Sequence, residues 1–312
     1  APTRFEMDAA ELRRLIDKTR FAISTEETRY YLNGIYLHHA KAGSANVLRA
    51  VATDGHRLAL AETEAPKGSS TLKGVIVPRK AVAEARRLLD DAPETVVIEA
   101  SDSKIVFRIG EAVLTSKLID GSFPDYQRVI PKENNRILIV EKKPFKDAVD
   151  RVATVSAERS RSVKLTLSPG KLTLAVSNAE TGSGAEELEV EYDAEPMEIG
   201  FNAKYLLDVA SQIEADETRI EFNDAASPAR VLDASDAGDR AQREGIDLAI
   251  RAGRGHRHRR GFRAVRVHRT RRGRGASVRA GRELTRMQAV PDRTGTPCLL
   301  GRDDPRDRAA PR

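Results

Sequence analysis

The sequence predicts an α+β fold of two tandem domains, each with two helices packed on antiparallel sheets. Within the first 238 of the 312 residues, one order of elements, a strand, a helix and then several strands, occurs four times. The expected helices begin roughly 60 to 70 residues apart, and a repeat of this kind is stronger evidence on architecture than any single motif. Ile105, Phe107 and Ile109 recur at every second position, as on the buried face of a strand.

The first unit covers residues 4–61. An extended piece leads into a helix that Asp8 can cap, with Glu11 three residues later. Strand-like runs follow at 29–38, 47–53 and 56–61. The last two flank Asp54-Gly55, a pair that tolerates the positive φ angles of a type I′ turn, so we expect a hairpin here.

The other three units follow the same order. The second has a strand at 74–77, a helix opened by Pro78 and strands at 95–100, 104–109 and 112–119. A linker follows at Gly121–Pro124. The third unit has a strand at 137–140, a helix opened by Pro144 and strands at 163–167, 171–177 and 186–192. The fourth has a strand at 198–201, a helix at 203–213 capped by Asn202 and strands at 219–223 and 230–234. We therefore expect domains at 1–121 and 122–238.

Charge divides the chain differently. Residues 239–312 contain 21 Arg, no Lys and 8 acidic residues, a net charge of +13, so the overall +6 leaves −7 for residues 1–238. The segment is either a nucleic-acid-binding tail, acting through Arg240 to Arg274, or the product of a shifted reading frame. The second interpretation rests on its lack of Lys, since the earlier part has 14 Lys beside 18 Arg. Under both interpretations we expect this tail to be disordered or poorly packed.

Several function classes lack their signatures. No apolar run is long enough to span a membrane, and the single cysteine, Cys298, fits a reducing cytoplasm. Zinc-ligand spacing, glycine-rich phosphate loops, GxSxG and HExxH are missing from the sequence. Asp54 and His56 beside Thr53 are a poor catalytic set, because a tight turn does not orient them and no third group is evident. We expect no catalytic residue, cofactor or metal.

Basic residues gather on the expected helices. They are Arg13, Arg14, Lys18 and Arg20 on the first, Arg79, Lys80, Arg86 and Arg87 on the second, Lys143 and Lys146 on the third, and Lys204 on the fourth. Such faces are either simply solvated or, in a domain pair with net negative charge, a surface that follows phosphates without reading sequence. Tyr30 and Tyr31 could stack on bases, although one of them must point inward in an alternating strand.

The hairpin suggests a second type of site. Arg29, Leu32, His56, Arg57 and Leu58 could line an apolar cleft with charged rims, of the kind that captures short peptides. An ordinary sheet edge is the alternative, and spacing does not separate the two.

Five runs carry a resemblance to a known family. They are RYYLNGIYL (29–37), VATDGHRLA (51–59), VIVPRKAV (75–82), TSKLIDGSFPDYQRVIPK (115–132) and MEIGFNAKYLLDV (197–209). From about Thr3 to about Asp236 the chain resembles the second and third domains of the bacterial DNA polymerase III β subunit, the sliding clamp.

The resemblance implies a DNA-clamp fold and a binding function. In this family two three-domain protomers close head-to-tail into a ring around duplex DNA, with helices lining the hole. The clamp performs no chemistry; it tethers the DNA-directed DNA polymerase, a nucleotidyltransferase, and also binds the clamp loader and other proteins that carry a clamp-binding motif. By matching motif, the peptide pocket of this sequence comprises Arg29, Leu32, Thr53, Gly55, His56, Arg57, Leu58, Pro124, Arg128 and Val129. Tyr30 and Tyr31 match residues that contact single-stranded DNA.

Two departures from the family pattern lead to further expectations. The chain begins at the family's second domain, and the ring interface joins the first domain of one protomer to the third of the other, so we expect ring closure to need the first domain. The family's terminal strand with a Met-Pro-Met-Arg type end does not occur here. We therefore expect a shifted frame near Asp236 to Asp239 and a missing last strand. The alternative function is a non-ring nucleic-acid-binding protein that acts through the Arg-rich tail.

Overall fold

The computed structural model describes residues 2–155, 162–178, 182–234 and 246–250. All of them belong to one compact unit formed by residues 1–268, and the second unit, residues 269–312, lies outside the described part. The Arg-rich tail at 239–312 is therefore described only at Ile246–Ile250, and Cys298 and the segment Arg240 to Arg274, apart from these five residues, lie outside.

The α+β prediction is confirmed. The described residues form four α-helices, and each lies within one of the four predicted units: α1 (Ala9–Thr19), α2 (Arg79–Leu88), α3 (Lys142–Ala153) and α4 (Ala203–Ala210). Side-chain caps set two of the helix starts, because Asp8 accepts from the amides of Ala10 and Glu11, and Asn202 accepts from that of Lys204.

Two of the sheets have four antiparallel strands each. One has the order β1 (Thr3–Asp8), β6 (Thr95–Ala100), β7 (Lys104–Ile109) and β8 (Ala112–Lys117). The other has the order β12 (Gly182–Glu189), β11 (Lys171–Asn178), β10 (Ser162–Ser168) and β13 (Met197–Asn202).

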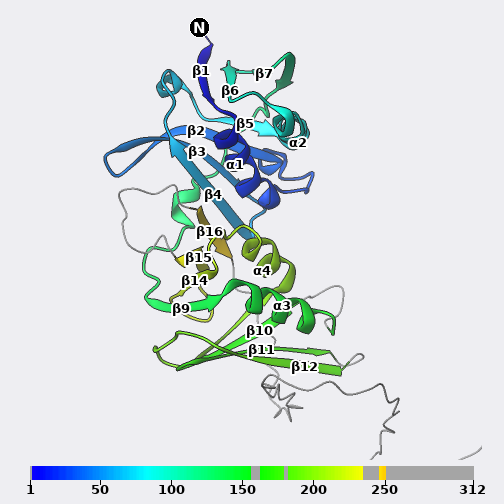
Figure 1. The fold of residues 1–312 in the computed structure, drawn as a ribbon, viewed down its shortest axis with the longest axis vertical. Coiled ribbons are helices and arrows are strands. Elements are labelled where there is room, and N and C mark those ends of the chain that lie inside the picture. Colours follow the sequence, from blue (N-terminus) through cyan, green and yellow to red (C-terminus); the bar gives the residue numbers. More distant parts are fainter. Residues whose placement is uncertain (1, 156–161, 179–181, 235–245, 251–312) are drawn as a thin grey trace, which may run out of the picture. The chain divides into compact units, whose positions relative to one another are not determined.

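The third sheet has eight strands and joins the two predicted domains (Figure 1). Its order is β5 (Val75–Pro78), β2 (Gly34–Ala42), β3 (Ala45–Thr53), β4 (Arg57–Glu64), β16 (Ile246–Ile250), β15 (Ala229–Asp233), β14 (Glu217–Phe222) and β9 (Arg136–Glu141). The boundary between the domains, which the sequence places near residue 121, stays a prediction.

Strand β16 corrects the expectation that the chain lacks a last strand. It also corrects the expectation of a disordered or poorly packed tail at Ile246–Ile250, the five residues of the tail that the structure describes. It pairs antiparallel with β15 on one side and β4 on the other. Leu248, Ala249 and Ile250 are buried. A short apolar segment between two strand edges satisfies the backbone groups of both, which explains why it folds in a part of the chain dominated by Arg.

The helices lie against the sheets through apolar stripes. Helix α1 packs on β3 and β4, α2 on β2, β5 and β8, and α3 on β10, β11 and β12. A large apolar cluster fills these contacts. A second, smaller cluster comprises Val51, Leu58, Leu60, Tyr126 and Ala249, with Tyr36, Phe123 and Ile130 packed against it. This linker cluster brings β3, β4, β16 and the segment around residues 123–130 together.

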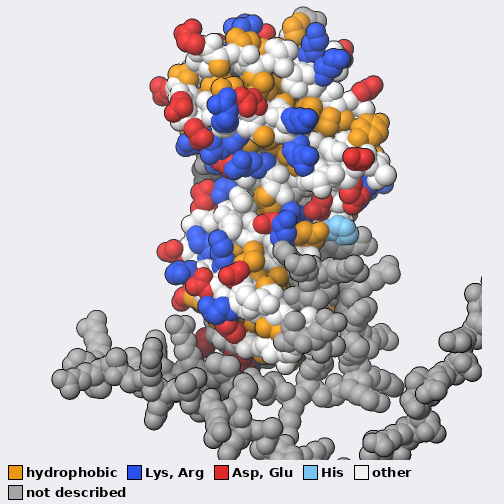
Figure 2. Space-filling model, turned by 90° about the vertical axis from the view of Figure 1, so that its right-hand side faces the viewer, with side chains coloured by type: hydrophobic (Ala, Val, Ile, Leu, Met, Phe, Trp, Pro, Cys, Tyr) orange, Lys and Arg blue, Asp and Glu red, His pale blue; other side chains and the backbone are white. Residues whose placement is uncertain are grey.

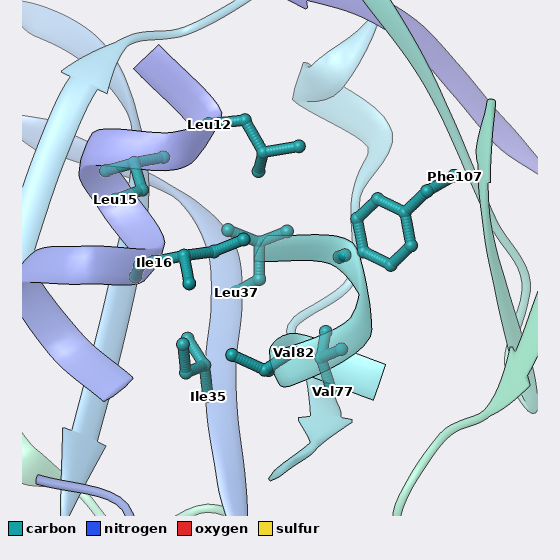
Figure 3. A pocket seen from close by; sticks show the side chains of 10 residues that line it. Leu12, Leu15, Ile16, Ile35, Leu37, Val77, Val82 and Phe107 are labelled. Carbon is teal, nitrogen blue, oxygen red and sulfur yellow. The ribbon is translucent and has the colours of Figure 1, made fainter. Parts of the chain in front are cut away.

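A small cavity lies within the core between α1, α2 and β2 (Figure 3). Its volume is about 20 Å³, and its lining is entirely apolar, including Leu12, Leu37, Val82 and Phe107. A space of this size could hold one water molecule only if polar groups bound it. The cavity is therefore a packing defect and not a ligand site.

Some element boundaries differ from prediction. Tyr30 and Tyr31 lie in a short 3-10 helix (Tyr30–Leu32), and β2 begins only at Gly34, so the strand predicted from residue 29 is wrong at its start. Pro78 ends β5 instead of opening α2, and α3 begins two residues before Pro144. Proline tolerates both positions, because the N-cap, where Pro78 lies, and the first turn, where Pro144 lies, have N–H groups without intrahelical partners.

Candidate functional site

The β3–β4 turn lies one residue later than predicted. Thr53 pairs with Leu58, and the amide of Asp54 donates to the carbonyl of Arg57 at 3.4 Å, so Gly55 and His56 form the centre of the turn. The carboxylate of Asp54 accepts from the amides of His56 and Arg57 at 2.9 and 3.0 Å. An Asp that binds the backbone two and three residues ahead favours the first position of a turn, which accounts for the shift.

Gly55 allows a close approach by Arg29. Its φ is +87°, and a Cβ at this position would lie 2.3 Å from Nη1 of Arg29. Any larger residue would displace the guanidinium, which is held by the carboxylate of Glu26 at 2.8 Å. The structure thus brings two of the predicted pocket residues together for a steric reason.

Arg57 is the most constrained residue of the turn. Its guanidinium donates to Asp54 at 3.2 Å, to the carboxylate of Asp208 on α4 at 2.5 Å and to the carbonyl of Phe21 at 2.7 Å. The rings of Tyr205 and Phe21 lie 4.6 and 5.2 Å from its Cζ, within the range of cation–π attraction. Burial raises the pKa of Tyr205, so this ring stays neutral beside the cation.

The hairpin and the linker meet at Leu58. Leu58 is buried in the linker cluster with Tyr126 and with Ala249, its register partner on β16. Phe123 stacks on Tyr36 with ring centroids 4.9 Å apart. The structure therefore places the segment that carries Pro124, Arg128 and Val129 on the same sheet as the turn.

The predicted pocket residues divide into exposed and buried groups. Gly55, His56, Pro124, Arg128 and Val129 are exposed, whereas Leu32, Thr53, Arg57 and Leu58 are buried and Arg29 is intermediate. Val129, with 55% of its surface exposed, is a large apolar side chain open to solvent. A ligand would touch mainly the exposed residues, and the buried residues would support them from behind.

Sequence reasoning missed residues that hold this site in place. They are Phe21, Tyr205 and Asp208 around Arg57, and Tyr126 and Ala249 around Leu58. Tyr126 lies within a motif that the family resemblance covers, but its buried position follows only from the folded sheet. Tyr205 and Asp208 also lie within such a motif, at 197–209, but their contact with Arg57 follows only from the folded chain. Phe21 and Ala249 lie outside all five motifs, and no local pattern signals them.

Most of the predicted DNA-facing cations are exposed. Those open to solvent are Arg13, Arg20, Arg79, Lys80, Arg87, Lys143, Lys146 and Lys204. Lys and Arg side chains gather on the face of the molecule shown in Figure 2, with acidic side chains among them. Two other predicted cations are partly buried: Arg14 contacts Glu11, and Arg86 is bound by Asp17 and Asp90.

Lys18 is a correction to the predicted DNA-facing set. Only 7% of its surface is exposed. Its ammonium donates to the backbone carbonyl of Gln212 and pairs with the carboxylate of Glu214 at 2.6 Å. Helical periodicity alone turned Lys18 outward, but the second predicted domain covers this end of α1, so the charge is not available to a phosphate.

The tyrosine pair is only partly exposed. Tyr30 is 53% exposed and Tyr31 is intermediate, with their rings edge to face at 5.8 Å. One ring is thus open to solvent, and a 3-10 helix, not an alternating strand, orients the pair. Stacking of these rings on bases stays a prediction.

Two site classes have no candidate in the described ranges. No group of three His, Cys, Asp or Glu side chains could hold a metal ion. None of the helices there is long and apolar enough to cross a membrane.

Comparison with known proteins identifies the family. The model for the central domain of the DNA polymerase III beta subunit matches residues 6–125, and the model for its C-terminal domain matches residues 127–241. The chain belongs to the DNA polymerase III beta subunit family. The beta sliding clamp of Caulobacter vibrioides is 60% identical over 236 residues, which are 76% of this chain and 63% of that protein. The clamp of Pseudomonas putida is 40% identical over 73% of this chain and 61% of that protein.

Solved sliding clamps share the fold. A Caulobacter crescentus beta sliding clamp superposes with a TM-score of 0.77 at 56% identity, covering 81% of this chain and 65% of that one. Two Bartonella birtlesii clamp structures, one of them bound to griselimycin, give TM-scores of 0.76 and 0.72 at 48% and 45% identity. They cover 81% of this chain in both cases, and 66% and 68% of those chains. The chain spans less than two thirds of the two beta sliding clamps compared by sequence.

Proposed function

We propose that this chain acts as part of the processivity factor of the bacterial replicative DNA polymerase III. In the proposed function the clamp encircles duplex DNA and tethers the polymerase, so that dissociation no longer ends synthesis. The observation that carries the proposal is the meeting of the β3–β4 hairpin and the residue 123–130 linker at Leu58. It occurs in a chain matched by both clamp-domain models.

The peptide pocket is the central element of the proposal. The exposed residues His56, Pro124, Arg128 and Val129 would contact an extended peptide, while the buried Arg57 and Leu58 support them. An apolar surface with charged rims suits short motifs that combine aliphatic and polar residues. The polymerase catalytic subunit, the clamp loader and other motif-bearing proteins would share this pocket.

The exposed cations on the four helices would face the duplex. Lys and Arg contacts to phosphates carry no sequence information and weaken as salt rises. Weak contacts suit a protein that holds DNA by topology and slides along it. For the whole protein we propose the ring itself, which is a homodimer in this family. The ring would act in the cytoplasm and would perform no chemistry of its own.

Peptide binding to the full chain tests the proposal. A fluorescent peptide with the clamp-binding motif of a polymerase III catalytic subunit would be titrated while its anisotropy is followed. We expect Val129→Ser to weaken binding roughly tenfold, as for loss of an apolar contact at an interface core. Val113→Ser is the matched control, because Val113 is 56% exposed on β8, outside the proposed pocket.

The two outcomes are distinct. Weaker binding for Val129→Ser alone supports the pocket at the hairpin and linker. Equal binding by both variants, or no binding by the wild-type chain, would reject the proposed peptide site.

A further inference from the structure

A buried polar network joins the linker to the central sheet. Tyr126 begins a short 3-10 helix (Tyr126–Arg128), and only 6% of its surface is exposed. Its hydroxyl accepts from Nη1 of Arg49 on β3 at 2.8 Å and lies 3.0 Å from Nε2 of His38 on β2. Arg49 in turn pairs with Glu62 on β4, and both side chains are about nine-tenths buried.

The direction of the hydrogen bonds follows from chemistry. Nδ1 of His38 lies 3.0 Å from the carbonyl oxygen of His39, which can only accept, so Nδ1 carries a proton. Burial lowers the pKa of His38 and keeps the ring neutral, so its Nε2 has no proton and accepts from the Tyr126 hydroxyl. The hydroxyl therefore acts as both acceptor and donor, and no other side chain of similar shape can replace it.

The network fixes a segment that is otherwise exposed. Pro124 and Arg128 flank Tyr126 and are open to solvent, and Val129 follows. The amide of Val129 donates to the carbonyl of Tyr126 at 3.1 Å, so the position of Tyr126 sets that of its neighbours. Phe123 adds a second contact through its stack on Tyr36, and that ring is stacked on His38 in turn.

We infer that Tyr126 is the positioning residue of the peptide pocket: its hydroxyl, held between Arg49 and His38, fixes the linker so that Pro124, Arg128 and Val129 face the ligand in one arrangement. This inference rests on the proposed peptide-binding function. An ordered pocket wall avoids the ordering cost that a loose one adds to binding, so anchoring increases affinity without any contact between Tyr126 and the ligand.

The test compares two tyrosines in the full chain. Tyr126→Phe deletes the anchoring hydroxyl. Tyr192→Phe is the matched control, because Tyr192 is also buried and its hydroxyl donates one bond, at 2.7 Å, to the carbonyl of Glu195, three residues along the chain. Peptide affinity, the thermal unfolding midpoint and amide hydrogen exchange of residues 119–132 are measured for each.

We expect Tyr126→Phe to weaken peptide binding roughly tenfold through lost preorganisation and to accelerate exchange in the linker. Tyr192→Phe lowers the unfolding midpoint but leaves affinity and linker exchange unchanged. If Tyr126→Phe keeps wild-type affinity and linker exchange, Tyr126 is only a structural residue and the inference is overturned.

Two further outcomes are informative. If Tyr126→Phe does not fold, the variant His38→Phe replaces it, because it keeps an aromatic ring beside Tyr36 but removes the acceptor of the Tyr126 hydroxyl. Faster linker exchange with weaker peptide binding supports the inference. Unchanged exchange and affinity overturn it. If the wild-type chain binds no peptide, the proposed function fails, and the positioning role fails with it. Linker exchange then shows only whether Tyr126 anchors the segment.

Discussion

Arg57 donates from Nη1 to Oδ2 of Asp208 at 2.5 Å, and this bond joins the β3–β4 turn to helix α4. The two residues lie 151 positions apart in the chain. The same guanidinium belongs to the proposed peptide pocket, so the pocket and the contact between the two halves of the described fold share one side chain.

Removing the charge of Asp208 should destabilise the fold. Asp208→Asn leaves the buried guanidinium of Arg57 with Asp54 and the Phe21 carbonyl but without its charged partner on α4. We expect a loss of about 2 kcal/mol in the free energy of unfolding, typical of a hydrogen bond to a charged group. Urea unfolding measures it, with Glu111→Gln in the exposed β7–β8 turn as the control. A loss no larger than that of the control would show that the pair contributes nothing.

The Lys18–Glu214 pair should make stability depend on pH in the acid range. A hydrogen bond from Lys18 lowers the pKa of the Glu214 carboxyl below its ordinary 4.5. A carboxyl with a lowered pKa stabilises the folded state above that value, and the contribution disappears as pH falls through the folded-state pKa. Urea unfolding between pH 3 and 7 should therefore show a shallower acid decline for Glu214→Gln than for the wild type. Lys18→Met should remove the difference in acid decline between Glu214 and Gln at position 214. If the decline is the same with and without Lys18, another carboxyl causes it.

His38 should produce a second, separate dependence. Burial, with a contribution from the charge of Arg49, lowers its pKa below the ordinary 6.5. Below pH 6.5 the unfolded chain therefore binds a proton that the folded chain resists, so the free energy of unfolding falls as pH decreases from 7 toward 5. We expect His38→Gln to reduce this fall, measured by urea unfolding at fixed ionic strength. His39→Gln, one residue away on β2, removes only one of the smaller charge contributions that lower the pKa of His38, so it should change the profile less than His38→Gln.

Strand β16 should contribute strongly to stability. Leu248 is fully buried between β4 and β15, and Leu248→Ala should cost about 3 kcal/mol, within the range measured for buried leucines. The exposed Val113→Ala on β8 should cost little by comparison. Guanidinium unfolding of both variants is the measurement, and near-equal midpoints would mean that β16 does not pack in solution.

The local parts of the fold were predictable from sequence. Caps such as Asp8 and Asn202 act within three residues of their own position, and alternation at residues 105–109 marks β7, so both can be recognised in a short window. The site was predictable only in part. Arg57 and Leu58 were candidates from the predicted hairpin and again from the family resemblance, while Asp208 and Ala249 approach them only after the chain has folded.

Lys18 shows the same limit in the opposite direction. Its place on α1 beside other cations favoured a solvated or DNA-facing side chain, and helical periodicity could not reveal that residues 212–214 cover it. The charge pattern of one helix indicates which side is polar, but it does not indicate whether that polar side faces solvent or another part of the protein.

The register of β16 has a consequence for the order of folding during translation. Leu248 pairs with Ala59, so 189 residues must be synthesised after Ala59 before this partner on the second neighbour of β4 exists. Contacts between such distant segments form late, because closing a long loop costs entropy before the pairing is gained. Until then β4 exposes an unpaired edge with apolar neighbours, the surface that favours misassembly. A ribosome that stalls or terminates before residue 246 would release a nascent chain in which this edge stays open.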